Sequence, residues 1–389
     1  MKITGIWTRR GPMLAALIAF AAVVADGTLP LPWGFGHAPV IAQVEDAAPA
    51  PHTAGIAPKP PWRTLAETTT LDRIAFGSCL DQNKPQPIWK AVLASQPQLF
   101  LMIGDNVYGS IRSAGLEKLR TAYAKQAAQP ELAEARQAIP FLAVWDDNDF
   151  GMGDGGASFP YKTQSVQLFY EFWQMRAEPR ESGGIYYSRI YGPAGRRLQI
   201  IMLDTRTFRS DLKPKPADFP FHGKYGADDD PAKTMLGPEQ WGWLEGELKS
   251  PAEIRLLVSS VQVLAEGHGY ERWGNLPRER DRLLRLIEET KAKRVIVLSG
   301  DRHAGAFYRR TEGLSYPLVE LTSSSLNRPI GPLGDARTPE LISDFYEAEN
   351  FGLLEVDWSG AKVRLSLRGV AGQEVSAVSL SFRELGPGP

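Results

Sequence analysis

The chain has 389 residues, of which 43% are hydrophobic and 23% are charged. Such a composition is that of an ordinary globular protein with one large or two average domains, and it excludes a chain that is disordered throughout. The 44 basic and 45 acidic side chains nearly cancel, so no basic surface for nucleic acid or an anionic membrane is evident.

The first residues follow the pattern of an export signal. Basic residues precede an apolar run at 13–25, which matches a signal-peptide core and is too short to span a bilayer. Small residues offer cleavage after Ala25 or, as we prefer, after Ala42. We therefore predict a signal peptide at 1–42 rather than a stable transmembrane anchor, and a periplasmic or extracellular protein. The paired Arg9 and Arg10 leave Sec and twin-arginine export both open.

Residues 43–61 are rich in Ala and Pro and predict a linker, so that 62–389 would form the folded domain. Cys79 is the single cysteine, which excludes an internal disulfide although exported proteins meet oxidising conditions. A lone exported thiol is open to oxidation unless it is buried in the core or bound to metal as a thiolate. The position of Cys79 after a strand favours the metal.

The first half of the domain alternates strands and helices. We predict a strand at 71–77, a helix at 87–94, a strand at 98–103, a helix at 115–136 broken at Pro130, and a strand at 140–144. That alternation is typical of a parallel sheet covered by helices.

A second set of elements follows. We predict helices at 163–175, 238–248 and 277–290, strands at 185–191, 197–203 and 254–260 and from residue 295, and antiparallel runs at 351–357, 363–367 and 376–382. The proline-rich stretch at 209–233 is long enough for a lid or a mobile surface loop. Two sheets packed face to face, with helices outside, fit these elements.

Side chains able to bind metal or phosphate gather where the predicted strands end. They are Cys79, Asp105, Tyr108, Asp146, Asp147, Asn148, Asp149, Asp204, Arg206, Asp301 and His303. Strand ends of an α/β sheet meet at one edge, and carboxylates brought together at low dielectric repel unless a cation compensates. Any single Asp could instead cap a helix, but the set as a whole favours one metal site.

The donor types limit which metal would bind. Beyond the leader and linker the chain has only His222, His268 and His303, which excludes a zinc site built mainly from imidazoles. Carboxylates suit calcium, magnesium or manganese, and a phenolate with carboxylate and thiolate suits ferric iron. Tyr108 follows Asp105 closely and would either reach the same ion or pack as a core tyrosine.

Several short motifs surround these residues. They read FGSC at 76–79, GDNVY at 104–108, WDD at 145–147, LDTR at 203–206, SVQ at 260–262 and SGDRH at 299–303, with LGPEQW at 236–241 and ERWGNLP at 271–277. Together, and in this order, they resemble the alkaline phosphatase D (PhoD-like) family of metallophosphoesterases. The resemblance runs from about residue 71 to residue 303, which is most of the folded domain.

This resemblance implies an α/β fold, a four-layer sandwich of two mixed β-sheets flanked by helices. It implies hydrolysis of small-molecule or polymer phosphate esters, monoesters or diesters, through attack by a metal-bound hydroxide. The implied cofactors are Fe³⁺ with Ca²⁺, while Mn²⁺ and Zn²⁺ are alternatives used in the wider superfamily.

The resemblance also implies a role for each strand-end residue. The metal ligands would be Cys79 and Tyr108 for iron, Asp105 as a bridge, Asp147 for the second ion, and Asp301 with His303 from the last strand. Arg206 would hold a phosphate oxygen through its planar guanidinium.

One position departs from the family pattern. Where its members usually have His after Trp-Asp-Asp, this chain has Asn148, whose amide can bind phosphate but cannot supply a proton near neutral pH. Either His268 or a metal-bound water takes the acid role, or the substrate has a good leaving group, or activity is weak. The alternative function is therefore a catalytically weakened, metal-stabilised binding protein. The physiological substrate and the oligomeric state stay open.

Overall fold

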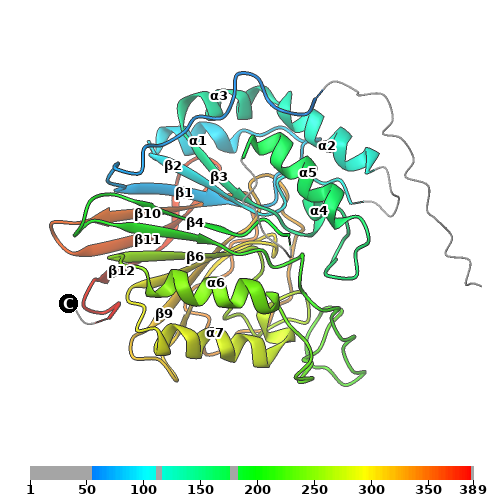
Figure 1. Cartoon of the computed structure of the whole chain (residues 1–389), viewed down its shortest axis with the longest axis vertical. Helices are drawn as coiled ribbons and strands as arrows, with labels where there is room; N and C mark the ends of the chain where they lie inside the picture. Colours follow the sequence, from blue (N-terminus) through cyan, green and yellow to red (C-terminus); the bar gives the residue numbers. More distant parts are fainter. Residues whose placement is uncertain (1–54, 111–115, 176–182, 387–389) are drawn as a thin grey trace, which may run out of the picture. The chain divides into compact units, whose positions relative to one another are not determined.

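Two six-stranded mixed sheets lie at the centre of the computed structural model of the chain (Figure 1). The structure describes residues 55–110, 116–175 and 183–386, all within the unit Thr53–Pro389. The predicted signal peptide and residues 43–54 of the predicted linker lie outside the described residues. Among the residues that are described, no helix is both long and apolar enough to cross a bilayer.

The first sheet joins the two ends of the domain. Its strands, in order across the sheet, are β12 (Glu374–Ser381), β11 (Lys362–Gly369), β10 (Asn350–Asp357), β1 (Arg73–Gly77), β2 (Leu99–Ile103) and β3 (Phe141–Val144). The three N-terminal strands run parallel, as predicted. β10 pairs antiparallel with β1, with Ile74 opposite Leu354, a pairing that local sequence patterns did not predict.

The second sheet carries the remaining strands. They are β4 (Tyr187–Tyr191), β5 (Leu198–Met202), β6 (Ile254–Ser259), β7 (Val295–Ser299), β9 (Leu318–Ser323) and β8 (Gly305–Arg310), again in order across the sheet. The four central strands run parallel, and β4 and β8 are antiparallel edges. β8 and β9 were both missed, and β9 runs parallel to β7 although we expected antiparallel strands in this part of the chain. In β8, Arg309 and Arg310 interrupt the apolar pattern of a buried strand.

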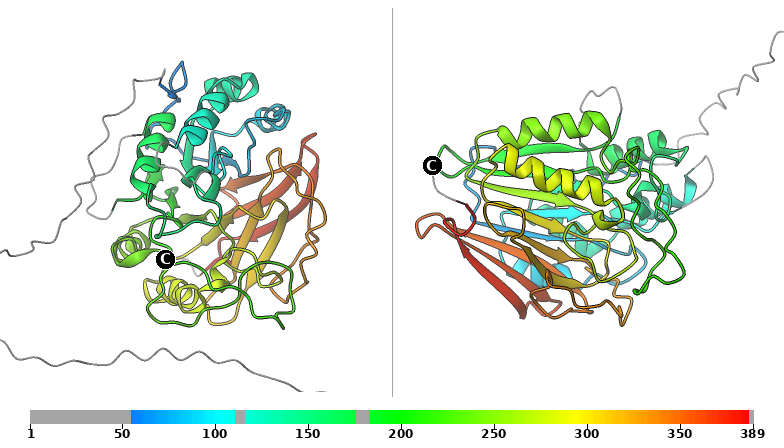
Figure 2. Two further views of the ribbon diagram at one scale, coloured as in Figure 1. Left: turned by 90° about the vertical axis from the view of Figure 1, so that its right-hand side faces the viewer. Right: turned by 90° about the horizontal axis from the view of Figure 1, so that it is seen from below.

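Helices cover the outer face of each sheet (Figures 1 and 2). α1 (Ile88–Ala94), α2 (Glu117–Ala127), α3 (Pro130–Ala138) and α5 (Lys162–Trp173) lie on the first sheet, and α6 (Gly237–Lys249) and α7 (Pro277–Glu289) on the second. The break predicted at Pro130 separates α2 from α3, because proline suits the first turn of a helix. The predicted four-layer sandwich is confirmed.

Alternate residues of the central strands enter two different cores. On β5, Ile200 packs in the core between the sheets, whereas Ile201 packs in the core beneath α6 and α7. All of β5, β6 and β7 is buried, which explains why these strands read as continuous apolar runs rather than alternating ones.

Part of the segment predicted as a linker packs on this domain. Ile56 is only 1% exposed and its amide donates to Glu171 Oε1. The Arg136 guanidinium donates to the carbonyls of Lys59 and Pro60. The packed part of the chain therefore begins before Trp62, where we expected it to start.

Candidate metal centre

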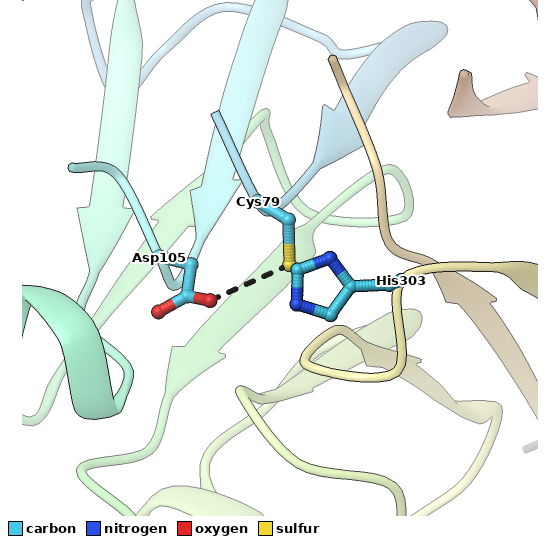
Figure 3. Close-up of side chains that lie close together, drawn as sticks. All are labelled: Cys79, Asp105 and His303. Atoms are coloured by element: carbon cyan, nitrogen blue, oxygen red, sulfur yellow. Dashed lines mark hydrogen bonds between the residues drawn. The ribbon is translucent and has the colours of Figure 1, made fainter. Parts of the chain in front are cut away.

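A thiol, a carboxylate and an imidazole converge just beyond the ends of three strands. Cys79, Asp105 and His303 follow β1, β2 and β7, and each places a ligand atom within 4.8 Å of the other two. Cys79 Sγ lies 3.6 Å from Asp105 Oδ2, and the three side chains point toward a common centre (Figure 3). The convergence expected from the strand ends is therefore present for these residues.

Four of the predicted ligands share an unusual backbone conformation. Cys79, Asp105, Asp301 and His303 have φ values of 60°, 51°, 63° and 59°. Residues other than glycine rarely adopt this left-handed region, which costs free energy that the surrounding fold must supply. Strain of this kind concentrates at functional sites.

His303 is held in the orientation of a ligand. Its Nδ1 lies 2.5 Å from the carbonyl oxygen of Arg328, and its backbone amide donates to Ser324 Oγ. Histidines that bind metal usually donate their other ring N–H to a carbonyl or carboxylate. The contact thus leaves Nε2 as the ring nitrogen that can bind a metal ion together with Cys79 and Asp105.

A second group of carboxylates extends the site. Asp105, Asp146 and Asp147 each place an oxygen within 4.8 Å of the others, as do Asp147, Asp154 and Glu271. Asp147 opens the short helix α4 (Asp147–Phe150), and it belongs to both groups. Among the described residues, Asp301 falls outside these groups, although the charges of Asp146 and Asp147 act on it.

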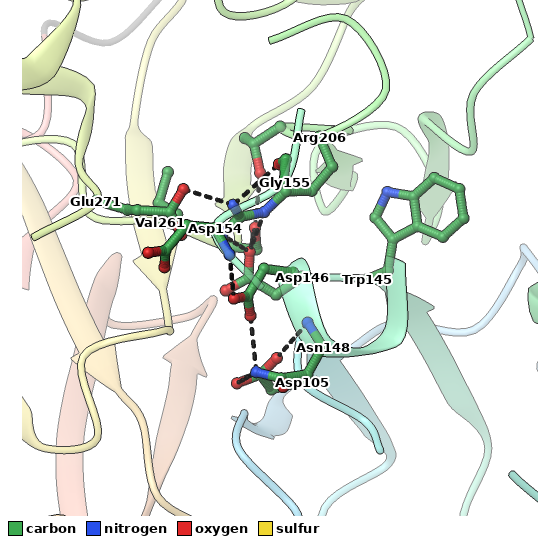
Figure 4. A network of polar contacts seen from close by, with 12 residues as sticks. Asp105, Trp145, Asp146, Asn148, Asp154, Gly155, Arg206, Val261 and Glu271 are labelled. Atoms are coloured by element: carbon green, nitrogen blue, oxygen red, sulfur yellow. Dashed lines mark hydrogen bonds and ion pairs between the residues drawn. The ribbon is translucent and has the colours of Figure 1, made fainter. Parts of the chain in front are cut away.

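Asn148 contacts two predicted ligands, of which Figure 4 shows Asp105. Its Nδ2 donates to Asp147 Oδ1 at 2.8 Å and to Asp105 Oδ2 at 3.3 Å, and its backbone amide donates to Asp105 Oδ1. Ser110 Oγ donates to its Oδ1. The amide therefore orients the carboxylates at the place where the family resemblance leads us to expect histidine.

In one part of the site, the Asp105 carboxylate has no arginine or lysine paired with it among the described residues. Burial, followed by repulsion from Asp147 and Asp146, raises the pKa of Asp105 well above its usual value. Burial, followed by repulsion from Asp146, also raises the pKa of Asp301. Burial, followed by repulsion from Asp105, raises the pKa of the Cys79 thiol. A bound cation would remove this cost.

Unpaired buried atoms point to the same conclusion. Tyr108 Oη and Asp146 Oδ2 are buried without a hydrogen-bond partner in the described structure. Buried polar atoms are normally paired, and a metal ion would satisfy such oxygens. Thiolate, phenolate, imidazole and carboxylate donors together fit ferric iron, and the all-oxygen group fits a harder cation such as calcium.

The other part of the site is neutralised by arginine. Arg206 is fully buried; its Nε donates to Asp146 Oδ1 at 2.6 Å and its Nη1 to Glu271 Oε1 at 2.7 Å. Arg209 forms an ion pair with the same Glu271 oxygen at 2.9 Å (Figure 4 shows Arg206 and Glu271). Burial raises the pKa of Asp146 to about 7 against the attraction of Arg206.

Comparison with known proteins identifies the family. The family model of the PhoD-like phosphatases matches residues 74–350, well over half of the chain. The chain belongs to the PhoD-like phosphatase family. Alkaline phosphatase D of Bacillus subtilis (strain 168) is 24% identical over 268 residues, which cover 59% of this chain and 45% of that protein. The chain thus spans just under half the length of this relative.

A solved structure supports the same fold. A structure of PhoD superposes with a TM-score of 0.63 at 19% sequence identity, covering 82% of this chain and 70% of that one. The predicted fold class and the predicted family are both confirmed.

Two predicted roles in this PhoD-like phosphatase do not agree with the contacts. Arg206 has no exposed surface, and Asp146 and Glu271 hold its guanidinium as an internal counterion, so its predicted contact with phosphate stays a prediction that these contacts do not favour. His268 is 1% exposed; its Nδ1 accepts from the Tyr270 amide and its Nε2 lies 2.9 Å from Gln262 Oε1. Burial lowers the pKa of His268 well below its usual value, so a neutral ring with both nitrogens engaged does not suit a proton donor.

Sequence reasoning missed three further residues of this site. Glu271 lies within the ERWGNLP motif, just before the short 3₁₀ helix η1 (Trp273–Asn275), and its position in that motif was the available signal. Asp154 and Arg209 lacked any such signal. Arg209 Nη2 donates to the carbonyls of Asp154 and Gly155, which ties the start of the 209–233 segment to the site.

The rest of that segment also packs beside the site. Tyr225 Oη donates to Asp154 Oδ2 at 2.8 Å, and Lys224 Nζ forms an ion pair with the same oxygen. The segment we predicted to be a lid or a mobile loop is therefore attached to the site by these contacts. Whether it moves stays a prediction.

Proposed function

We propose that this chain is an exported, metal-dependent phosphoesterase that hydrolyses phosphate monoesters, diesters or both. The observation that supports this most directly is the convergence of Cys79, Asp105 and His303 within 4.8 Å in a PhoD-like phosphatase. The substrates themselves are small-molecule or polymer phosphate esters in this proposal.

The proposal assigns two metal positions. Cys79, Tyr108, Asp105 and His303 would hold Fe³⁺, and Asp147, with Asp105 shared, would hold Ca²⁺, while Mn²⁺ or Zn²⁺ are the alternatives. Bound metals would supply Lewis acidity toward the phosphoryl oxygens and a hydroxide nucleophile near neutral pH. Asp301 would complete the ligand set from the loop after β7.

Asn148 has a positioning role in this proposal. Its amide holds the carboxylates of Asp105 and Asp147 in place, and these carboxylates would hold the metal ions. Because an amide has no proton to give near neutral pH, we expect this enzyme to prefer esters with good leaving groups, such as aryl phosphates.

The second candidate function is a metal-stabilised binding protein that has lost turnover. The observation that favours it is Asn148 itself, because neither Asn148 nor the buried, neutral His268 can protonate a leaving alkoxide. Both candidate functions require the bound metal, but only the phosphoesterase would hydrolyse phosphate esters.

The test is metal analysis of the mature protein, purified without chelator or nickel affinity resin, with hydrolysis of aryl phosphate mono- and diesters measured on the same sample. Near-stoichiometric iron and calcium, with turnover lost on chelation, would support the enzyme and rank the two ester classes. Metal without turnover would favour the binding protein. Absence of metal would overturn both.

Export needs a separate measurement. We propose that residues 1–42 are removed as a signal peptide and that the linker and domain follow from residue 43. N-terminal sequencing of the protein recovered from the extracytoplasmic fraction should begin at Gln43. An N-terminus at Met1 in a membrane fraction would favour an uncleaved anchor instead.

A further inference from the structure

A phosphate ester at this site needs a cation that still has N–H donors without a partner. Arg206 and Arg209 are buried and already form ion pairs with Asp146 and Glu271. Among the described residues, Lys224 and Arg328 border the site with side chains that are 60% and 35% exposed.

We propose that Arg328 binds the phosphoryl group of the substrate and of the inorganic phosphate product, an inference that rests on the proposed phosphoesterase function. Its guanidinium carbon lies 4.0 Å above the ring centre of Tyr108. The carbonyl oxygen of the same residue contacts His303 Nδ1. Arg328 is therefore next to two residues that we assign to the iron position.

The free donors of Arg328 suit this role. Among the described residues its guanidinium has one polar partner, Asp81, which it contacts through Nη1. A guanidinium has five N–H donors in a planar fork that matches two phosphate oxygens. The guanidinium can therefore donate hydrogen bonds to a ligand while its Nη1 stays bound to Asp81.

The segment that carries Arg328 is fixed to the metal centre. Asn327 is 1% exposed; its Oδ1 accepts from the Asp81 amide at 2.6 Å and its Nδ2 donates to the Asp81 carbonyl at 3.0 Å. Its backbone amide donates to the Cys79 carbonyl. Arg328 is thus placed in advance of ligand binding, which reduces the entropy cost of the contact.

Lys224 is the weaker candidate for the same contact. Its ammonium is bound to Asp154, beside the Asp147–Asp154–Glu271 group, where Arg206 and Arg209 already supply positive charge. Arg328 instead borders Tyr108 and His303, on the side of the site where the described carboxylate Asp105 forms no ion pair with an arginine. An ammonium also lacks the two-pronged geometry of arginine.

The experiment measures the inhibition constant of inorganic phosphate and the KM for an aryl phosphate with metal-loaded protein. For Arg328→Gln we expect the inhibition constant to rise ~10- to 100-fold, the effect of losing a charged hydrogen-bonded contact. KM should rise in parallel, with kcat changing less and the metal content unchanged. The matched control is Arg337→Gln, since Arg337 is 62% exposed and pairs only with Asp344 and a backbone carbonyl in the described structure.

Two further measurements separate phosphate binding from a structural role. Arg328→Lys keeps the charge but not the fork, and should bind phosphate between the wild type and Arg328→Gln. In the unmodified protein, inorganic phosphate should protect Arg328 from phenylglyoxal, detected by mass spectrometry. An unchanged inhibition constant in Arg328→Gln, or labelling that phosphate does not slow, would overturn the assignment.

The proposal and the phosphoesterase function fail in different ways. Calorimetric titration of inorganic phosphate into the metal-loaded protein needs no turnover. Phosphate binding that depends on Arg328 without hydrolysis would support Arg328 and count against the enzyme. Hydrolysis with phosphate affinity that depends on Lys224 and not on Arg328 would overturn the Arg328 assignment alone.

Discussion

Arg206 and Asp105 show two ways in which this fold accommodates buried charge. Arg206 is enclosed by Asp146 and Glu271, so its positive charge is compensated inside the protein. Among the described residues, Asp105 lies near other acids, a thiol, an amide and the His303 imidazole, and it forms no ion pair with an arginine or lysine. Removing one partner of the buried Arg206 pairs would leave an uncompensated charge in the protein at a high cost in free energy. The ionised Asp105 carboxylate, in contrast, would be stabilised by a cation that binds from solution.

The Asp105→Asn variant should lose metal and activity together. Asp105 contributes an oxygen to both groups near Cys79 and Asp147, so we expect the bound metal to fall and hydrolysis to drop at least ~100-fold, beyond what outer-shell changes cost. Elemental analysis and aryl phosphate hydrolysis measure both. Asp344→Asn, at a side chain that is 94% exposed, is the control. Full metal content with full turnover would refute the site assignment.

The Asn148→His variant should gain activity on esters with poor leaving groups. An imidazole between Asp105 and Asp147 would offer a proton near neutral pH, an effect of ~100-fold or more in other enzymes. The comparison is the rate on an alkyl phosphate relative to an aryl phosphate, each as a function of pH. If the ratio and the pH profile both stay as in the wild type, our account of Asn148 is wrong.

At the scale of the element, the positions of the strand ends could be predicted from the sequence, but the contacts of the side chains that follow them could not. Asp105 and Asp204 both follow a buried strand, yet Asp105 faces the other acids. Asp204 accepts from the amides of Arg206 and Thr207 and from Trp145 Nε1. Local spacing is the same in both cases, and only contacts between distant segments distinguish a ligand from a turn-stabilising residue.

The junction after β2 requires glycine. Gly104 has φ +116°, and a Cβ there would lie 2.7 Å from the Asp146 Cβ and 3.0 Å from the Ser260 Cβ. We expect Gly104→Ala to lower the free energy of unfolding by ~1–3 kcal/mol, the cost of such backbone strain, and to weaken metal binding because Asp146 must move.

The control for Gly104→Ala is Gly242→Ala in α6. A Cβ at Gly242 would meet nothing within 4 Å, and alanine is favoured over glycine inside a helix by about 1 kcal/mol. Denaturant unfolding should therefore show opposite signs for the two variants. Equal stability of Gly104→Ala and the wild type would refute the packing argument.

At the scale of the whole molecule, the stability of the metal-free protein should fall as pH rises. Folded Asp146 has a pKa of about 7, and those of Asp105 and Asp301 are also raised, so the folded state keeps protons that the unfolded chain releases above about pH 4. Because the folded state binds more protons, each retained proton lowers stability by about 1.4 kcal/mol per pH unit across this window.

Thermal unfolding between pH 5 and pH 8 checks this expectation. The metal-free protein should be most stable at the acidic end, and bound metal should remove most of the slope because it replaces those protons. The same slope with and without metal would mean that the cation does not bind among these carboxylates.

The pairing of β1 with β10 has a consequence for how the chain folds. β1 precedes Cys79, and its neighbour β10 follows nearly all the rest of the domain in the sequence, so the first sheet and the Asp81–Asn327 contact both join segments that are far apart along the chain. Contacts so distant in sequence slow folding, and until they form, the edge of β1 stays open to pairing with other chains. We therefore expect refolding to be slow and prone to aggregation, and metal added during refolding to be captured only after β10 has docked.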